Sequence, residues 1–280
     1  MVLLVRYGEL SLKSPYVRRQ LEDRLATNVQ EMFAASGVEC VVRRERGRVF
    51  VHAEDEAAAT LLLRRVFGIV SISPAKEATS DLEKLTAFVV DDARALLKPG
   101  MTFAIRPQRS GQHPYTSQDL ARRLGQAVRD GIPRVAVDLD APDREIHVEV
   151  RGRRAYVFHE IVEGPGGLPL GSQGEALAAV HDDAGLVAAW LVMRRGCRVA
   201  VAAEGAYAEA LRRWDPRLET LPAGQGPDLA RLAAQRGVRA IVVSSFAAEP
   251  APRAILTLTP LAGLAAPEIA DLARRIENPV

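Results

Sequence analysis

A run of glycine and proline interrupts this chain at residues 164–172, which read Gly-Pro-Gly-Gly-Leu-Pro-Leu-Gly-Ser. Proline removes a backbone donor and glycine favours turns, so this run cannot continue a helix or a strand. It therefore predicts a junction between domains. The composition is compatible with a flexible hinge or a shaped loop, and the prolines favour the shaped loop because they restrict the backbone.

The first unit before the junction, residues 1–75, has the pattern of a ferredoxin-like domain. Apolar spacing and turn residues predict strands and helices in the order β-α-β-β-α-β. The helix signal is clearest after Ser14, which can cap a helix whose first turn holds Pro15. We expect these elements at Val2–Val5, Pro15–Ala35, Glu39–Val42, Arg48–His52, Asp55–Val66 and Ile69–Ile72.

A second α/β unit, residues 76–165, follows the same kind of alternation. Ser80 with Glu83 three residues later predicts the start of a helix that ends at Leu97. A second helix is expected at Ser117–Arg129 from its apolar spacing. The expected strands are Met101–Arg106, Ala136–Leu139, Glu145–Val150 and Ala155–Glu163.

Beyond the junction, residues 172–280 alternate short apolar strands with helices. Repeated βα units predict a parallel sheet covered by helices on both faces. The expected fold class is therefore α/β, with two α/β domains followed by a small Rossmann-like domain.

The charge balance alone does not identify a partner. Lys+Arg 37 against Asp+Glu 35 gives a net charge of +2, and only four of the cations are lysines. Arginine binds phosphate through two donors and stacks on bases, so the positions of the arginines matter more than their number. They cluster in the first two domains, where a solvated surface is the alternative explanation for any single one.

The cysteines and histidines exclude some classes of site. Two cysteines, Cys40 and Cys197, cannot form a disulfide framework or a four-ligand zinc site, and the five histidines have no ligand spacing. Cys40 lies in a strand pattern and Cys197 lies between the end of a helix and an apolar strand, and both are predicted to be structural. No stretch approaches the ~18 apolar residues of a membrane span, and the apolar start is too short for a signal peptide. We expect a cytoplasmic protein with no membrane partner.

Three segments together resemble the tRNA 4-thiouridine synthetase (ThiI-like) family. They are Arg6-Tyr7-Gly8-Glu9-Leu10 with Leu12-Lys13-Ser14, the segment from Arg106 to Ser117, and Gly164 to Gly171. The resemblance implies a ferredoxin-like domain and a THUMP domain that bind tRNA. It also implies a PP-loop domain that activates a uridine with ATP before sulfur transfer.

The counterpart of the family's ATP-binding turn has a different composition. The family has Ser-Gly-Gly-x-Asp-Ser, and this chain has Val180-His181-Asp182-Asp183-Ala184-Gly185. A phosphate seat needs free backbone amides at a helix N-terminus, whereas a carboxylate about 4 Å from an anion repels it by ~4 kcal/mol at an effective dielectric near 20. An aspartate at a helix start is favourable by roughly 0.3–1 kcal/mol. We therefore predict a degenerate PP-loop domain with no catalytic residue, no metal and no cofactor.

A family cysteine in the later part of that domain also has no counterpart, because none follows Cys197. RNA contact is predicted for the loop that mixes guanidinium, imidazole, phenol and hydroxyl groups, a set that binds phosphates and 2′-hydroxyls and stacks on bases. The predicted partner is the acceptor region of tRNA, with no DNA partner. The predicted RNA-binding residues are Lys13, Arg106, Arg109, His113, Tyr115, Thr116, Ser117 and Arg122.

Two alternatives remain open. Asp182 and Asp183 could hold Mg²⁺ in a rearranged site, since carboxylates bind this ion. The chain would then be an ATP- and Mg-dependent tRNA uridine thiolation enzyme, a sulfurtransferase that acts with a separate sulfur-carrying partner and, by the family resemblance, is linked to thiamine biosynthesis. The other alternative is a scaffold that forms a homodimer through its third domain.

Overall fold

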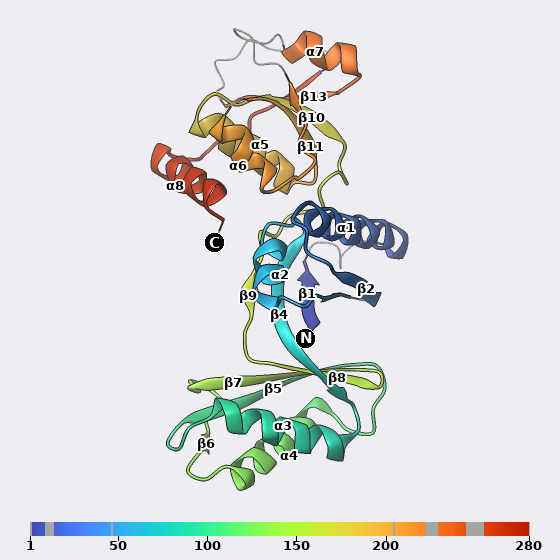
Figure 1. Cartoon of the computed structure of the whole chain (residues 1–280), viewed down its shortest axis with the longest axis vertical. Coiled ribbons are helices and arrows are strands. Elements are labelled where there is room, and N and C mark those ends of the chain that lie inside the picture. The colour runs from blue at the N-terminus through green and yellow to red at the C-terminus, as the bar shows by residue number, and fades with distance from the viewer. Residues whose placement is uncertain are drawn as a thin grey trace. The chain divides into compact units, whose positions relative to one another are not determined.

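The computed structural model describes residues 2–8, 14–45, 47–203, 205–221, 229–244 and 255–279 (Figure 1). The chain divides into two compact units. One contains residues 2–4 and Ser73–Val162, and the other contains Val5–Ile72 and Glu163–Val280. None of the helices in the described ranges has the length and apolarity needed to cross a bilayer.

The ferredoxin-like order is confirmed, with strands arranged β2-β3-β1-β4. Its longest helix begins as predicted, because the Ser14 hydroxyl accepts a hydrogen bond from the Val17 amide at 3.4 Å and Pro15 occupies the first turn. The main departure is the last strand, which runs to Thr79 and pairs there with the following unit, Lys76 opposite Val157. The elements are β1 (Val2–Tyr7), α1 (Pro15–Ala35), β2 (Val41–Glu45), β3 (Arg48–His52), α2 (Glu56–Leu63) and β4 (Ile69–Thr79).

In the unit that contains Ser73–Val162, α3 and α4 lie on one face of the sheet β4-β8-β7-β5-β6 (Figure 1). Helix α3 is capped by Asp81 and not by Ser80 as predicted, because the Asp81 carboxylate accepts from the Lys84 amide at 3.0 Å. The elements are α3 (Leu82–Leu96), β5 (Thr102–Ser110), α4 (Ser117–Gly131), β6 (Ala136–Val137), β7 (Arg144–Arg151), β8 (Arg154–Phe158) and β9 (Val162–Glu163).

The third part has the predicted parallel sheet, in the order β12-β11-β10-β13-β14. This order reverses direction at β10, which makes the carboxyl end of β10 the usual position of a ligand crevice. One hydrophobic cluster contains side chains of α5, α6 and α8, and a second contains side chains of α7. The elements are β10 (Glu175–Ala179), α5 (Asp183–Arg194), β11 (Arg198–Ala202), α6 (Ala206–Arg212), β12 (Thr220–Leu221), α7 (Leu229–Arg236), β13 (Ala240–Val242), β14 (Leu256–Leu258) and α8 (Ala266–Glu277).

The junction is a shaped loop, as its prolines predict. Gly167 has φ +77°, and a Cβ on it would lie 2.1 Å from the Arg194 carbonyl oxygen, so only glycine fits there. The Leu168 amide donates to the same oxygen at 3.0 Å. These contacts fix the loop against the end of α5.

The third part shares its core with the ferredoxin-like part. Phe67 stacks on Trp214 with ring centroids 5.4 Å apart and meets the edge of Trp190 at 5.5 Å. Arg198 donates to Glu31 of α1 at 2.7 Å. The two parts therefore pack as one unit although most of the other unit separates them in sequence.

Candidate nucleic-acid interface

The predicted RNA-binding segment begins on β5, where Arg106 is already paired. Its Nε donates to Glu145 Oε1 at 2.7 Å, and its Nη2 donates to the Leu139 carbonyl at 2.8 Å. The hydrogen bond from Arg106 holds the pKa of Glu145 below its usual range. Neutralised by this neighbour, Arg106 has little net charge to offer a phosphate.

Arg109 and His113 brace the turn that follows β5. The Arg109 guanidinium donates to the Gly111 carbonyl at 3.2 Å and lies 3.5 Å from His113 Nδ1. The other ring nitrogen of His113 lies 2.9 Å from the Gly152 carbonyl. No acidic group pairs with Arg109 among the described residues, so its charge remains available at the turn.

Tyr115 does not have the exposure that was expected of it. Its side chain is buried in the core, its hydroxyl donates to the Ser80 carbonyl at 2.8 Å, and burial raises its pKa. His113 stacks on the ring at 5.6 Å. The ring is therefore covered in this structure, and RNA contact by Tyr115 stays a prediction.

The next two residues start α4. The Thr116 hydroxyl accepts from the Asp119 amide at 3.1 Å, and the Asp119 carboxylate accepts from the Thr116 amide at 3.0 Å, which forms a capping box. These bonds hold the pKa of Asp119 below its usual range. Ser117 is the first residue of the helix. Both hydroxyl residues thus position the helix, and a direct role in RNA contact stays a prediction.

Arg122 belongs to an open groove on α4 of about 740 Å³, here called the α4 groove. Three arginines line it, against a single aspartate, Asp119, which is engaged in the capping box and lies 3.8 Å from Arg122. Its other wall includes Val137 and Leu139, which are unusually exposed for apolar residues. The sequence places these two in a strand, but nothing in their pattern indicates that they face solvent. The lining is Asp119, Ala121, Arg122, Arg123, Gly125, Gln126, Arg129, Val137 and Leu139.

The remaining predicted residue, Lys13, lies outside the described residues. Several other arginines of the first two domains are paired with acids in the structure. Arg151 donates to Glu149 at 2.9 Å with both side chains nearly buried, and Arg154 lies 3.3 Å from Glu77. The surface charge is therefore more localised than the sequence suggests.

The turn from Val180 to Gly185 connects β10 to α5, at the crevice position of the parallel sheet. Asp182 caps α5, because its Oδ1 accepts from the Gly185 amide at 2.7 Å. Asp183 accepts from the Tyr207 hydroxyl at 3.2 Å. The amide that a bound phosphate would use is thus occupied by a carboxylate of the chain itself.

The other residues of this turn are apolar or unpaired. Val180 is buried in the core, and Ala184 packs against the same cluster. A Cβ at Gly185 would lie 3.1 Å from the Ala179 carbonyl oxygen, so close packing against β10 accounts for this glycine. His181 is exposed and has no partner among the described residues.

No reactive thiol or metal cluster is found in the described ranges. Burial raises the pKa of Cys40 and of Cys197, which is the opposite of what activates a thiolate. Within those ranges no group of three or more His, Cys, Asp or Glu side chains could hold a metal ion.

Comparison with known domain families identifies the first two parts. Residues 2–73 match the ThiI ferredoxin-like domain, and residues 79–160 match the THUMP domain. The α4 groove therefore lies within a THUMP domain.

The chain is also similar to curated tRNA sulfurtransferases. It is 42% identical over 206 residues to a probable tRNA sulfurtransferase of Methanosarcina acetivorans, covering 71% of this chain and 49% of that protein. For a protein of the same name from Aeropyrum pernix the identity is 44% over 213 residues, covering 72% and 52%. The chain spans about half the length of the curated relatives it matches.

Two solved structures share the fold. PH1313 from Pyrococcus horikoshii superposes with a TM-score of 0.82 at 26% identity, covering 98% of this chain and 99% of that one. A 4-thiouridine synthetase, solved as an RNA complex with bound ATP, superposes with a TM-score of 0.76 at 21% identity, covering 100% and 86%.

Proposed function

This chain belongs to the ThiI-like family as a THUMP-containing, tRNA sulfurtransferase-like protein, and we propose that it binds tRNA without activating ATP. The binding is ascribed to the ferredoxin-like and THUMP domains. The third domain has a structural role in this proposal, because it shares a core with the ferredoxin-like domain.

The observation that carries the second half of the proposal is the hydrogen bond from the Gly185 amide to Asp182. A phosphate at this helix end must displace that carboxylate and then approach Asp183 as well. Both aspartates are exposed, so solvent reduces the repulsion of an anion about 4 Å away from ~4 toward ~1 kcal/mol for each. Apart from Gly185, the turn also lacks the glycines and hydroxyls that would replace the lost amide contacts. These residues do not fit a pyrophosphate seat.

Support for tRNA binding comes from the THUMP match and from the α4 groove. Arg122, Gln126 and Arg129 recur at helical spacing along one side of α4, which gives a backbone-binding stripe. The 4-thiouridine synthetase that shares this fold was solved with RNA. Shape and phosphate contacts suit such a surface better than base reading does.

Titration of labelled tRNA in rising salt tests the first half. A phosphate-driven complex should weaken linearly on a plot of log K against log salt, and replacing Arg122 and Arg129 together by glutamine should make that slope shallower by about 1.4–1.8. Absence of binding at low salt, or a binding constant that does not change with salt, would contradict the proposed tRNA binding.

A second function is favoured by the names of the relatives, which are sulfurtransferases. In that case Asp182 and Asp183 hold Mg²⁺ with ATP. Calorimetry of the full chain with ATP and Mg²⁺ separates the two. A heat of ATP binding that is present in wild type and lost in Asp182→Ala supports the enzyme. No heat of ATP binding in either protein supports the binding protein.

A further inference from the structure

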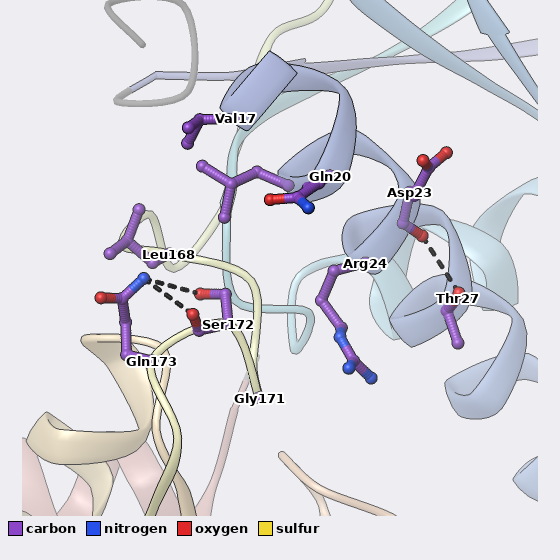
Figure 2. A pocket seen from close by; sticks show the side chains of 10 residues that line it. Val17, Gln20, Asp23, Arg24, Thr27, Leu168, Gly171, Ser172 and Gln173 are labelled. Carbon is purple, nitrogen blue, oxygen red and sulfur yellow. Dashed lines mark hydrogen bonds between the residues drawn. The ribbon is translucent and has the colours of Figure 1, made fainter. Parts of the chain in front are cut away.

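A cavity of about 840 Å³ lies between α1 and the junction loop. We call it the α1 cavity. Its volume falls within the roughly 300–1,000 Å³ of pockets that hold small ligands. Val17, Gln20, Arg24 and Thr27 recur at helical spacing on the side of α1 that faces Leu168 and residues 171–173 (Figure 2).

Arg24 is the cation of this cavity. Figure 2 shows its side chain extending from α1 on the side where the segment with Gly171 and Ser172 passes. Within the described part of the chain, no carboxylate or carbonyl pairs with it. The neighbouring acid, Asp23, points away from Arg24 and is paired with Arg44. A half-buried, unpaired guanidinium retains its full charge for a ligand.

Ser172 supplies a second donor on the opposite wall. Gln173 Nε2 donates to the Ser172 hydroxyl oxygen at 3.4 Å and to the Ser172 carbonyl at 2.9 Å (Figure 2). Because that hydroxyl acts as the acceptor, its own hydrogen is free to donate. The shaped junction loop holds this group in place, since Gly167 packs against Arg194 at the end of α5 and Gly171 packs against Arg198.

An exposed aromatic ring lies beside the cavity. Tyr16 is 72% exposed, and its hydroxyl accepts from Gln20 Nε2 at 2.9 Å. Gln20 itself lines the cavity. Tyr16 lies about two helical turns before Arg24 on α1. An exposed tyrosine and an unpaired arginine on one surface supply a stacking ring and a phosphate donor for successive nucleotides of a single strand.

We propose that the α1 cavity binds a backbone phosphate of an unpaired RNA nucleotide, with Arg24 and the Ser172 hydroxyl as donors and Tyr16 as the stacking surface for its base. This inference rests on the proposed tRNA binding and adds a site to it. One free cation in an open cavity holds a small free anion weakly, whereas it adds usefully to a polyanion that is bound elsewhere as well.

Fluorescence anisotropy of labelled tRNA with the full chain tests the site. Arg24→Gln should weaken binding several-fold at low salt and make the slope of log K against log salt shallower by about 0.7, the value for one phosphate of a single strand. Arg19→Gln is the matched control, because Arg19 is exposed on the same helix, has no described partner and does not line the cavity. Melting temperatures of both variants should equal that of the wild type.

Two further arms identify the ligand. Tyr16→Ala should weaken binding of a single-stranded oligoribonucleotide by between about fivefold and a hundredfold and leave blunt duplex RNA unaffected. In calorimetry with inorganic phosphate at matched ionic strength, wild type and Arg24→Gln should give the same heat.

The outcomes are distinguishable. If wild type binds tRNA and Arg24→Gln binds equally well, or no worse than Arg19→Gln, the site is overturned and the proposed function stands. If wild type binds no tRNA, the proposed function fails and this site with it. Saturable binding of phosphate that Arg24→Gln abolishes, with tRNA affinity unchanged, would assign the cavity to a small anion.

Discussion

Asp182 stabilises the first turn of α5 through its hydrogen bond with the Gly185 amide. Asp182→Ala removes this cap and should lower the free energy of unfolding by about 1 kcal/mol, whereas Asp182→Ser should retain most of it. The measurement is urea unfolding followed by tryptophan fluorescence. Both tryptophans of the chain, Trp190 and Trp214, lie in the core that contains α5. Equal stability of the alanine variant and wild type would contradict the capping role.

A buried aspartate in the THUMP domain gives a prediction on pH. Asp92 accepts from His159 and Lys76, at 2.6 Å each. Burial alone would raise the pKa of Asp92, but these hydrogen bonds outweigh it and hold the pKa below the ordinary value of 3.8. A lowered folded-state pKa gives stability that is present above the unfolded pKa and is lost as pH falls through the folded one.

Asp92→Asn should therefore cost about 1.5–3 kcal/mol at neutral pH, and its difference from wild type should shrink below about pH 4. Hydrogen exchange of the α3 amides at several pH values measures this difference in stability, since the helix contains Asp92. Asp91→Asn is the matched control, because the neighbouring Asp91 is exposed and, among the described residues, pairs with Arg94 alone. A difference that stays constant with pH would contradict the role given to Asp92.

The sequence identified arginine clusters but not which arginines are free. Arg106 was predicted to contact RNA, yet its partner Glu145 lies 39 residues away, on a strand whose register the sequence does not specify. Arg24 is one of several arginines on the predicted helix Pro15–Ala35, and its cavity exists because α1 meets a loop beyond residue 160. Pairing depends on tertiary contacts, which local patterns do not contain.

At the scale of elements, most helices and strands could be predicted, because caps and apolar spacing are local signals. Helix α1 has the predicted bounds, and α4 begins at the predicted Ser117. The predictions failed at strand ends. β4 and β5 extend to Thr79 and Ser110 because neighbouring strands continue to pair with them through polar residues.

Two glycines of the junction region, Gly167 and Gly174, share a positive φ but differ in packing. Gly167→Ala and Gly174→Ala both force a side chain into positive φ, which costs about 1–2 kcal/mol. Only the Cβ at residue 167 also meets the Arg194 carbonyl, whereas none of the described atoms lies within 4 Å of a Cβ at residue 174. We expect Gly167→Ala to cost a further ~1–3 kcal/mol. Thermal unfolding monitored by tryptophan fluorescence compares the two, and equal losses would contradict the packing argument.

For the whole molecule, the order of domains in sequence does not show which of them share a core. Phe67 comes from the ferredoxin-like part, and Trp190 and Trp214 come from the part beyond the junction. The sequence shows that each is aromatic, but it does not show that they are neighbours, because the whole THUMP domain lies between them. Side-chain identity predicts burial better than it predicts the neighbours of a buried residue.

Phe67→Ala should therefore destabilise both parts together. Loss of a buried phenylalanine costs about 3–5 kcal/mol, and it should shift the emission of the two tryptophans. Leu61→Ala on α2 is the control, since Leu61 is exposed, and it should change stability by less than about 0.5 kcal/mol. Tryptophan emission that is unchanged in the folded Phe67→Ala variant would contradict the shared core.

The cap on α5 also bears on how this sequence could change. A helix end that is completed by its own side chain is stable without any ligand. Substitution of Asp182 removes this cap and lowers the stability of the fold by about 1 kcal/mol. That loss comes before any nucleotide-binding turn has formed to compensate for it. Selection for a stable fold alone would therefore retain Asp182.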